Sequence, residues 1–95
     1  MSLTDREKQD ALRYAVNGAT FYFVPSVELS NMIVQGGPGT EEINDTLRPF
    51  LIQREAIKIE VDLVIRYCQN TLDSKNIWLL NHGDIKVIPQ QITIN

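Results

Sequence analysis

The distribution of isoleucine divides this sequence into two unlike halves. Nine of the eleven isoleucines lie after residue 50, whereas four of the five glycines lie before residue 40. β-Branched side chains lose rotamer freedom in a helix and pack well on a pleated sheet. The sequence therefore predicts an α+β fold: an N-terminal helix, one strand and one or two short helices, then a β-rich C-terminal half that is mainly antiparallel sheet.

The first half begins with the strongest helix signal in the sequence. Thr4 and Glu7 have the spacing of a capping box, and a stripe of apolar residues follows them. Asn17-Gly18 is a typical helix end, so a helix is predicted over residues 4–17. The aromatic run 19–24 is predicted to form a strand that ends at Pro25.

Two shorter helical segments are predicted next. Ser26 is a suitable N-cap for a helix over residues 27–35, which the glycine-rich turn 36–39 ends. Thr40 is predicted to cap a third segment, with Ile43 as part of its apolar contact. Because a proline disfavours helical geometry in the preceding residue, this segment should end, kink or restart at Pro49.

Residues 56–68 (AIKIEVDLVIRYC) fit two periodicities. As a strand, they place six apolar residues on one face and leave only Val64 on the wrong side. As a helix, they leave both Ile59 and Leu63 facing away from the apolar stripe. The strand misplaces fewer bulky side chains, so a strand is predicted here, with the helix as the alternative.

The last part of the sequence predicts a hairpin and a final strand. Residues 77–80 and 85–88 flank the loop 81–84, in which Gly83 suits a turn that needs a positive φ. Residues 91–95 are predicted to form a short strand after Pro89. A chain of 95 residues has room for one core, so residues 1–95 are expected to form a single small α+β domain.

Charge and cysteine content narrow the classes of function. Nine Lys and Arg against twelve Asp and Glu give a net charge of -3, and the basic residues are scattered, which argues against direct nucleic-acid binding. The single cysteine cannot form an internal disulfide. No stretch has the length and apolarity of a membrane helix or a signal peptide. We therefore expect a cytoplasmic protein that does not bind membranes.

The glycine-rich turn Gly36–Thr40 is one candidate chemical site. Phosphate-binding loops also precede a helix start, but no Lys with Ser or Thr follows the turn as in nucleotide-binding loops. Glu41 and Glu42 occupy the place where an anion would bind and would repel it. A simple turn between helices is the preferred interpretation.

Two further residue sets could carry chemistry. Cys68, His82 and Asp84 supply the residue types of a thiol–imidazole–carboxylate site, without any local signature around the cysteine. Glu60 and Asp62 could hold a hard cation from one strand face, although pairing with basic neighbours is the simpler interpretation. No catalytic residue, cofactor or metal is predicted.

An uncharged segment at the end of the sequence is the most suggestive feature. Residues 89–95 (PQQITIN) carry no charge, and Ile92 and Ile94 flank Thr93. Edge strands usually carry charge that prevents pairing with other chains. This segment is therefore expected either to pair within its own sheet or to add to a strand of another molecule. Ile92, Thr93 and Ile94 are the predicted interaction residues, together with Trp78, for which a place in the core is the simpler interpretation.

These observations favour a non-enzymatic protein–protein interaction module: an assembly component, adaptor, inhibitor or regulator. Its expected partner is another protein or a further copy of itself, bound through sheet edges. The alternative is a small-ligand-binding or catalytic domain with a pocket near the Gly36–Thr40 turn.

Overall fold

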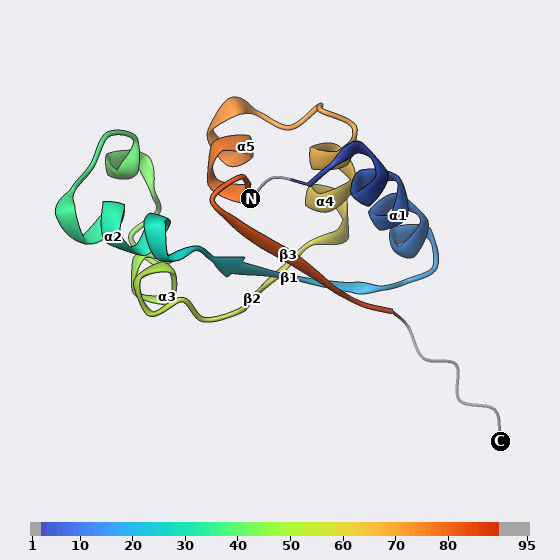
Figure 1. The fold of residues 1–95 in the computed structure, drawn as a ribbon, viewed down its shortest axis with the longest axis horizontal. Helices are drawn as coiled ribbons and strands as arrows, with labels where there is room; N and C mark the ends of the chain where they lie inside the picture. Colours follow the sequence, from blue (N-terminus) through green and yellow to red (C-terminus); the bar gives the residue numbers. More distant parts are fainter. Residues whose placement is uncertain (1–2, 90–95) are drawn as a thin grey trace, which may run out of the picture.

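A three-stranded antiparallel sheet organises the structure, a computed structural model that describes residues 3–89 (Figure 1). The central strand is β1 (Thr20–Pro25), which lies between β2 (Ile57–Ile59) and β3 (Gly83–Ile88). Phe23 of β1 pairs with Ile57 of β2 on one side and with Ile85 of β3 on the other. Within residues 3–89, β2 and β3 therefore each have one edge without a neighbouring strand.

Among residues 3–89, the helices lie over one face of this sheet and beyond one of its ends. Figure 1 shows a first group of helices above the strands and a pair beyond the end of β1. The first group is α1 (Asp5–Val16), α4 (Val61–Cys68) and α5 (Ser74–Leu80), and the pair is α2 (Val27–Gln35) and α3 (Arg48–Gln53), with the 3-10 helix η1 (Thr40–Glu42) between them in sequence. None of the helices within residues 3–89 has the length and apolarity needed to cross a membrane.

The predicted helix at the N-terminal end is confirmed, together with its cap. The Thr4 hydroxyl accepts a hydrogen bond from the Glu7 amide at 3.1 Å, and the Glu7 carboxylate accepts one from the Thr4 amide at 2.9 Å. This reciprocal pair satisfies two of the amides that a helix start leaves unbonded. Ala11 and Ala15 are buried along α1, which packs against α4.

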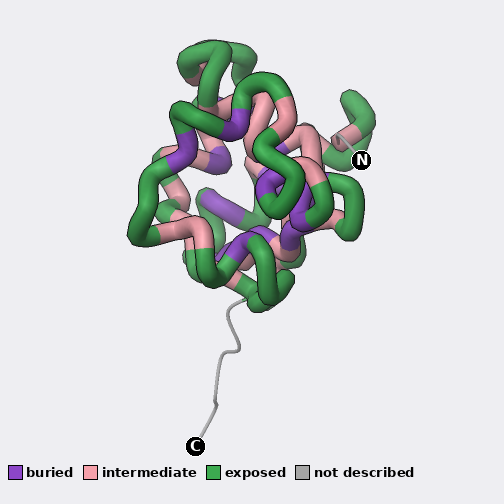
Figure 2. The backbone as a smooth tube through the Cα atoms, turned by 90° about the vertical axis from the view of Figure 1, so that its left-hand side faces the viewer, coloured by how far each residue is buried: buried purple, intermediate pink, exposed green. Residues whose placement is uncertain are grey.

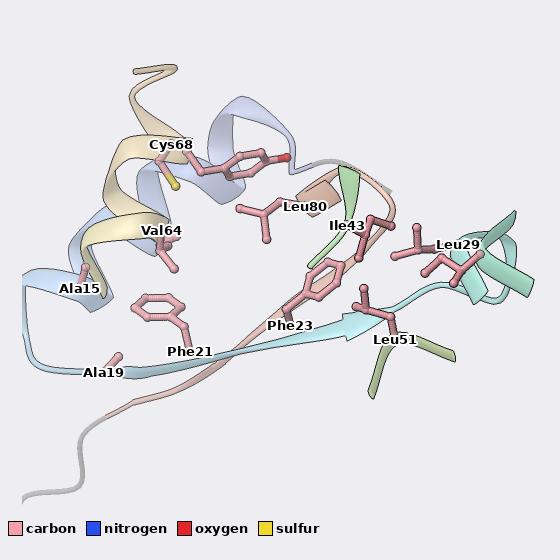
Figure 3. Packing of buried hydrophobic residues seen from close by; sticks show 13 residues of the cluster. Ala15, Ala19, Phe21, Phe23, Leu29, Ile43, Leu51, Val64, Cys68 and Leu80 are labelled. Carbon is pink, nitrogen blue, oxygen red and sulfur yellow. The ribbon is translucent and has the colours of Figure 1, made fainter. Parts of the chain in front are cut away.

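The core lies between the helix-covered face of the sheet and the helices. Phe21 and Phe23 project from β1 into it and are 0% and 2% exposed. Figure 3 shows Phe21 beneath Val64 of α4, and Phe23 beside Leu80 of α5 and Leu51 of α3. Full burial of such side chains contributes about 1.5–3 kcal/mol each. Figure 2 shows the same organisation along the backbone, with exposed positions on the outer turns.

The opposite face of the sheet carries polar and charged residues. Tyr22 lies opposite Lys58 on β2 and Lys86 on β3, so these three side chains share one row. Both lysines are exposed, and no helix covers this face in Figure 1. An antiparallel sheet with one packed face and one solvated face explains the alternating burial along β1.

The short segments of the first half agree in part with the predictions. The strand is β1, and Ser26 caps α2 by accepting a hydrogen bond from the Leu29 amide at 3.1 Å. Thr40 is not an N-cap, because Gly39 takes that position with a φ of 86° and Thr40 begins the 3-10 helix η1. The chain becomes helical again at Arg48, with Pro49 in the first turn, where a missing amide costs nothing.

The strand predicted over residues 56–68 is wrong for most of its length. Only residues 57–59 form a strand, and Glu60 then starts α4 as its N-cap. Val64, Tyr67 and Cys68 are buried on one side of this helix, which is the spacing of a helical face. The alternation of apolar and polar residues therefore corresponds to a strand only at β2, and the rest of the run follows a helical spacing.

The predicted hairpin is also wrong, because residues 77–80 belong to α5. Asp73 and Ser74 begin a helix whose apolar residues pack on the core, and β3 follows after a turn. β3 pairs with β1 instead of with residues 77–80. Helix accounts for about 52% of the described residues and strand for about 17%, so the expected β-rich C-terminal half is overstated.

Candidate functional site

An apolar groove of about 350 Å³ lies beside β2. Residues from the strand, from α3, α4 and α5, and from the segment before α3 meet around it. Most of its lining side chains are Leu or Ile: Phe23, Leu47, Leu51, Ile57, Lys58, Ile59, Glu60, Leu63, Asn76, Leu79 and Leu80.

The local fold explains why this groove reaches the edge of the sheet. Ile57 and Ile59 alternate toward the core, whereas Lys58 belongs to the opposite face. Lys58 and Glu60 nevertheless line the groove. The lining therefore includes residues of both faces of β2, and the groove lies along this edge strand.

The edge itself is free within the described part of the chain. β2 pairs with β1 on one side and has no neighbouring strand on the other. Among residues 3–89, no backbone hydrogen bond from outside the sheet reaches this edge. A free strand edge beside an apolar groove can receive an extended peptide, because the backbone pairs with the edge while alternate side chains enter the groove.

The outer edge of β3, the other edge strand, has a different neighbourhood. A smaller cavity of about 150 Å³ lies between α1 and β3, with Ile85 and Val87 on the strand side. Glu7 and Asp10 of α1 also line this cavity. Their carboxylates make it less suited to apolar side chains than the groove beside β2.

A second cavity of about 320 Å³ adjoins the groove, and the two share Leu47, Asn76 and Leu79 in their linings. Its other residues include Gly39, the glycine that ends the turn singled out in the sequence, and Trp78. A Cβ atom built on Gly39 would lie 3.5 Å from the Trp78 ring, which places the turn against the indole.

Trp78 is the one predicted interaction residue that falls within the described residues. It is half-buried, packs against the core and contacts the ring of His82, with 4.4 Å between ring centroids. The His82 Nδ1 atom also lies 2.6 Å from the Trp78 carbonyl oxygen. Trp78 therefore combines a structural role with a position at the second cavity. The other three predicted interaction residues, Ile92, Thr93 and Ile94, lie outside the described residues.

The candidate thiol–imidazole–carboxylate set does not assemble. Cys68 is buried on α4, and burial raises the pKa of its thiol. His82 contacts Trp78, and Asp84 is exposed on β3. No hydrogen bond joins Cys68 to either residue within the described chain.

The candidate cation site does not form either. Glu60 occupies the N-cap position of α4 without a capping hydrogen bond from its side chain, and the Asp62 carboxylate pairs with Arg66 at 3.1 Å along the same helix. Pairing of Asp62 with a basic neighbour is therefore confirmed, although it follows a helix and not a strand. In the part of the chain that the structure describes, no group of three or more His, Cys, Asp or Glu residues could hold a metal ion.

The groove itself was missed by the sequence analysis. Its leucines come from segments that are far apart in the sequence, and no local pattern joins them. Leu63 was the one available signal, because it is apolar and a helical periodicity leaves it outside the buried stripe. In the structure Leu63 is half-buried, lines the groove and is not among the side chains that pack against the buried core.

Comparisons of this chain with protein-family models, with curated proteins and with solved structures find no match.

Proposed function

We propose that the chain is a non-enzymatic protein–protein interaction module that receives an extended segment of a partner at the free edge of β2. The observation that carries this proposal is the continuity between this edge and the apolar groove of about 350 Å³ beside it. Assembly components, adaptors, inhibitors and regulators can all use such an edge.

Strand addition fits the chemistry of both surfaces. The β2 backbone offers hydrogen-bonding groups, and pairing them with an added strand gives affinity without requiring a particular sequence. Side chains two residues apart on that strand would lie about 6.6–6.8 Å apart on the same face. Two apolar side chains at this spacing would enter the groove, which gives preference for an alternating apolar segment.

The edge strand β2 has one charged residue. Natural edge strands limit association with other chains by short length, lysines, prolines or inward-pointing charges. The sequence of β2 is Ile57-Lys58-Ile59, and its single lysine belongs to the open face. The two isoleucines flank the groove, so an approaching apolar strand meets apolar side chains there.

A blocked seven-residue peptide of alternating Ile and Lys tests the proposal. We expect the peptide to slow amide hydrogen exchange at residues 57–59 of the full chain, because added backbone hydrogen bonds protect those amides. A peptide with the same composition in a scrambled order controls for attraction between its positive charge and the acidic chain. Equal effects of the two peptides, or none at residues 57–59, would contradict strand addition.

Leu63→Glu provides the matching protein variant. Leu63 lines the groove without packing against the core, and it lies in the first turn of α4, where a carboxylate is favourable. The variant should therefore fold but lose the peptide effect. Val34→Glu is the control, because Val34 is 66% exposed on α2 and does not line the groove.

The alternative function, a small-ligand site near Gly36–Thr40, is supported by the second cavity. Gly39 and Trp78 line about 320 Å³ together with Glu42, Asp73 and Lys75. The two carboxylates disfavour phosphate there. A thermal-shift screen with nucleotides, sugar phosphates and divalent ions, read together with the fluorescence of the single tryptophan, tests this site. A saturable shift with one compound, without a change in oligomeric state, would favour the alternative.

A further inference from the structure

We infer that the segment received at β2 is residues 90–95 of a second copy of this chain, with Ile92 and Ile94 in the groove. This inference rests on the proposed function, because it names the partner of the same edge. The chain would then associate with itself through its own C-terminal segment.

The chemistry of the segment matches the chemistry of the groove. Residues 90–95 (QQITIN) carry no charge, and Ile92 and Ile94 are two residues apart. A strand presents such residues on one face, with Thr93 on the other. The Ile-Thr-Ile pattern has the same length and the same alternation as the Ile-Lys-Ile of β2. Cross-strand pairs of β-branched residues stabilise a sheet.

The reach of the chain favours a second copy over the same molecule. β3 ends at Ile88, and β1 and β2 lie between it and the free edge of β2. A strand beyond β2 would be three strand spacings from β3, or about 14 Å. The four residues from Ile88 to Ile92 span about 14 Å only when fully extended, which leaves no chain for the turns at either end.

Pairing of the segment with the outer edge of its own β3 is less favourable. The cavity beside that edge measures about 150 Å³, and Glu7 and Asp10 contribute carboxylates to it. Burial of the two isoleucines there would remove water from these charged groups, which costs free energy. The groove beside β2 is larger, and seven of its eleven lining residues are Leu or Ile, with Lys58 and Glu60 as its charged members.

Three full-length variants test the inference by sedimentation velocity. We expect the natural sequence to sediment as a dimer or larger species, and Val34→Glu to behave in the same way. The double variant Ile92→Lys/Ile94→Lys and the variant Leu63→Glu should each be monomeric, because one lacks the apolar segment and the other lacks an apolar groove. Circular dichroism verifies that all of them fold.

A mixture of the two monomeric variants provides the decisive measurement. Ile92→Lys/Ile94→Lys keeps an intact groove, and Leu63→Glu keeps an intact segment. Mixed in equal amounts, they should form a 1:1 complex through one segment and one groove. A monomeric natural sequence, failure of the mixture to associate, or loss of association in only one of the two variants would overturn the inference.

The proposed function can survive that failure. The peptide of alternating Ile and Lys is titrated into the Ile92→Lys/Ile94→Lys variant. In this variant, residues 90–95 of a second copy lack the isoleucines that would enter the groove. Protection of residues 57–59 in this variant, together with a monomeric natural sequence, would keep strand addition and reject self-association. Absence of both effects would reject the two proposals together.

Discussion

The ring of Phe23 occupies the space that a side chain on Gly83 would need. A Cβ atom built on Gly83 would lie 2.6 Å from Cε1 of Phe23 and 2.4 Å from the Val24 carbonyl oxygen, closer than real Cβ atoms approach other heavy atoms. Gly83 is therefore required by this close approach at the start of β3, whereas the sequence predicted it for a turn with positive φ.

Gly83→Ala should therefore destabilise the fold by about 1–3 kcal/mol, the range for overpacking in a filled core. Urea unfolding followed by circular dichroism measures this change. Gly37→Ala is the matched control, because a Cβ there would meet its nearest neighbour at an ordinary 3.5 Å. Equal stability of the two variants would contradict the close packing of Gly83 on Phe23.

Two leucines that line the same groove should respond differently to truncation. Leu51 is 1% exposed and belongs to the core, so Leu51→Ala should cost about 2–5 kcal/mol. Leu63→Ala should cost less than about 1 kcal/mol, since Leu63 is only half-buried and does not pack against the core. Thermal unfolding of both variants tests whether the groove is open at Leu63. A loss of stability in Leu63→Ala similar to that in Leu51→Ala would show that Leu63 is packed in the core and that the groove is closed there.

A partly buried hydrogen bond joins α4 to the end of α5. The Tyr67 hydroxyl donates to the Asn81 side-chain oxygen, and Tyr67 is buried. Tyr67→Phe should lower the free energy of unfolding by about 0.5–1.5 kcal/mol, because the ring is kept and the hydrogen bond is lost. Tyr14→Phe is a suitable control, since Tyr14 is 39% exposed. The two variants are compared by urea unfolding, and a larger loss for Tyr14→Phe would argue against this bond.

Stability should fall as the pH becomes alkaline. Burial raises the pKa of both Cys68 and Tyr67 above their ordinary values of 9.0 and 10.0. The unfolded chain loses these protons at the ordinary values while the folded chain still holds them, so the unfolded state binds fewer protons and stability decreases with rising pH. The contribution is fully present below the ordinary values and is lost as pH rises through the raised ones.

Urea unfolding at a series of pH values from 7 upward measures this loss. Cys68→Ala should reduce the slope of the unfolding free energy against pH in the lower part of the alkaline range, where the thiol titrates. At higher pH, Tyr67 should maintain this slope. The comparison uses the slope and not the stability itself, since removal of a buried thiol also changes packing. A pH-independent stability of the natural sequence would be inconsistent with the burial of these two groups.

Local signals predicted the first half of the fold well, because its helix ends are encoded by neighbouring residues. The capping pair Thr4 and Glu7, the cap at Ser26 and the glycines after α2 each satisfy backbone groups within a few positions. Such bonds do not depend on the tertiary fold, so they can be identified without it.

The second half was harder because two elements share one apolar run. Residues 57–59 alternate as a strand, and α4 begins two residues later at Val61. If a helical periodicity is assumed for the whole of residues 56–68, Ile59 lies outside the apolar stripe. Ile59 belongs to β2, however, and not to the helix. Once Glu60 separates the two elements, Leu63 is the remaining exception, and this leucine lines the groove.

Helix α5 was missed because all of its apolar residues contact the core. Ile77, Trp78, Leu79 and Leu80 form a continuous run that has no helical stripe, and all four pack on or within the core. A run of this kind cannot be distinguished from a buried strand by periodicity. The groove that adjoins α5 depends on the tertiary fold, so no local pattern marks it. Trp78, which was singled out from the sequence, lines the neighbouring cavity.

The position of β1 in the sheet has a consequence for how the protein forms during synthesis. Both strands that pair with β1 come much later in the sequence, and the last of them ends at Ile88. Phe21 and Phe23 therefore emerge from the ribosome long before their partners on either side exist. We expect the sheet to form only after nearly all of these residues have been translated.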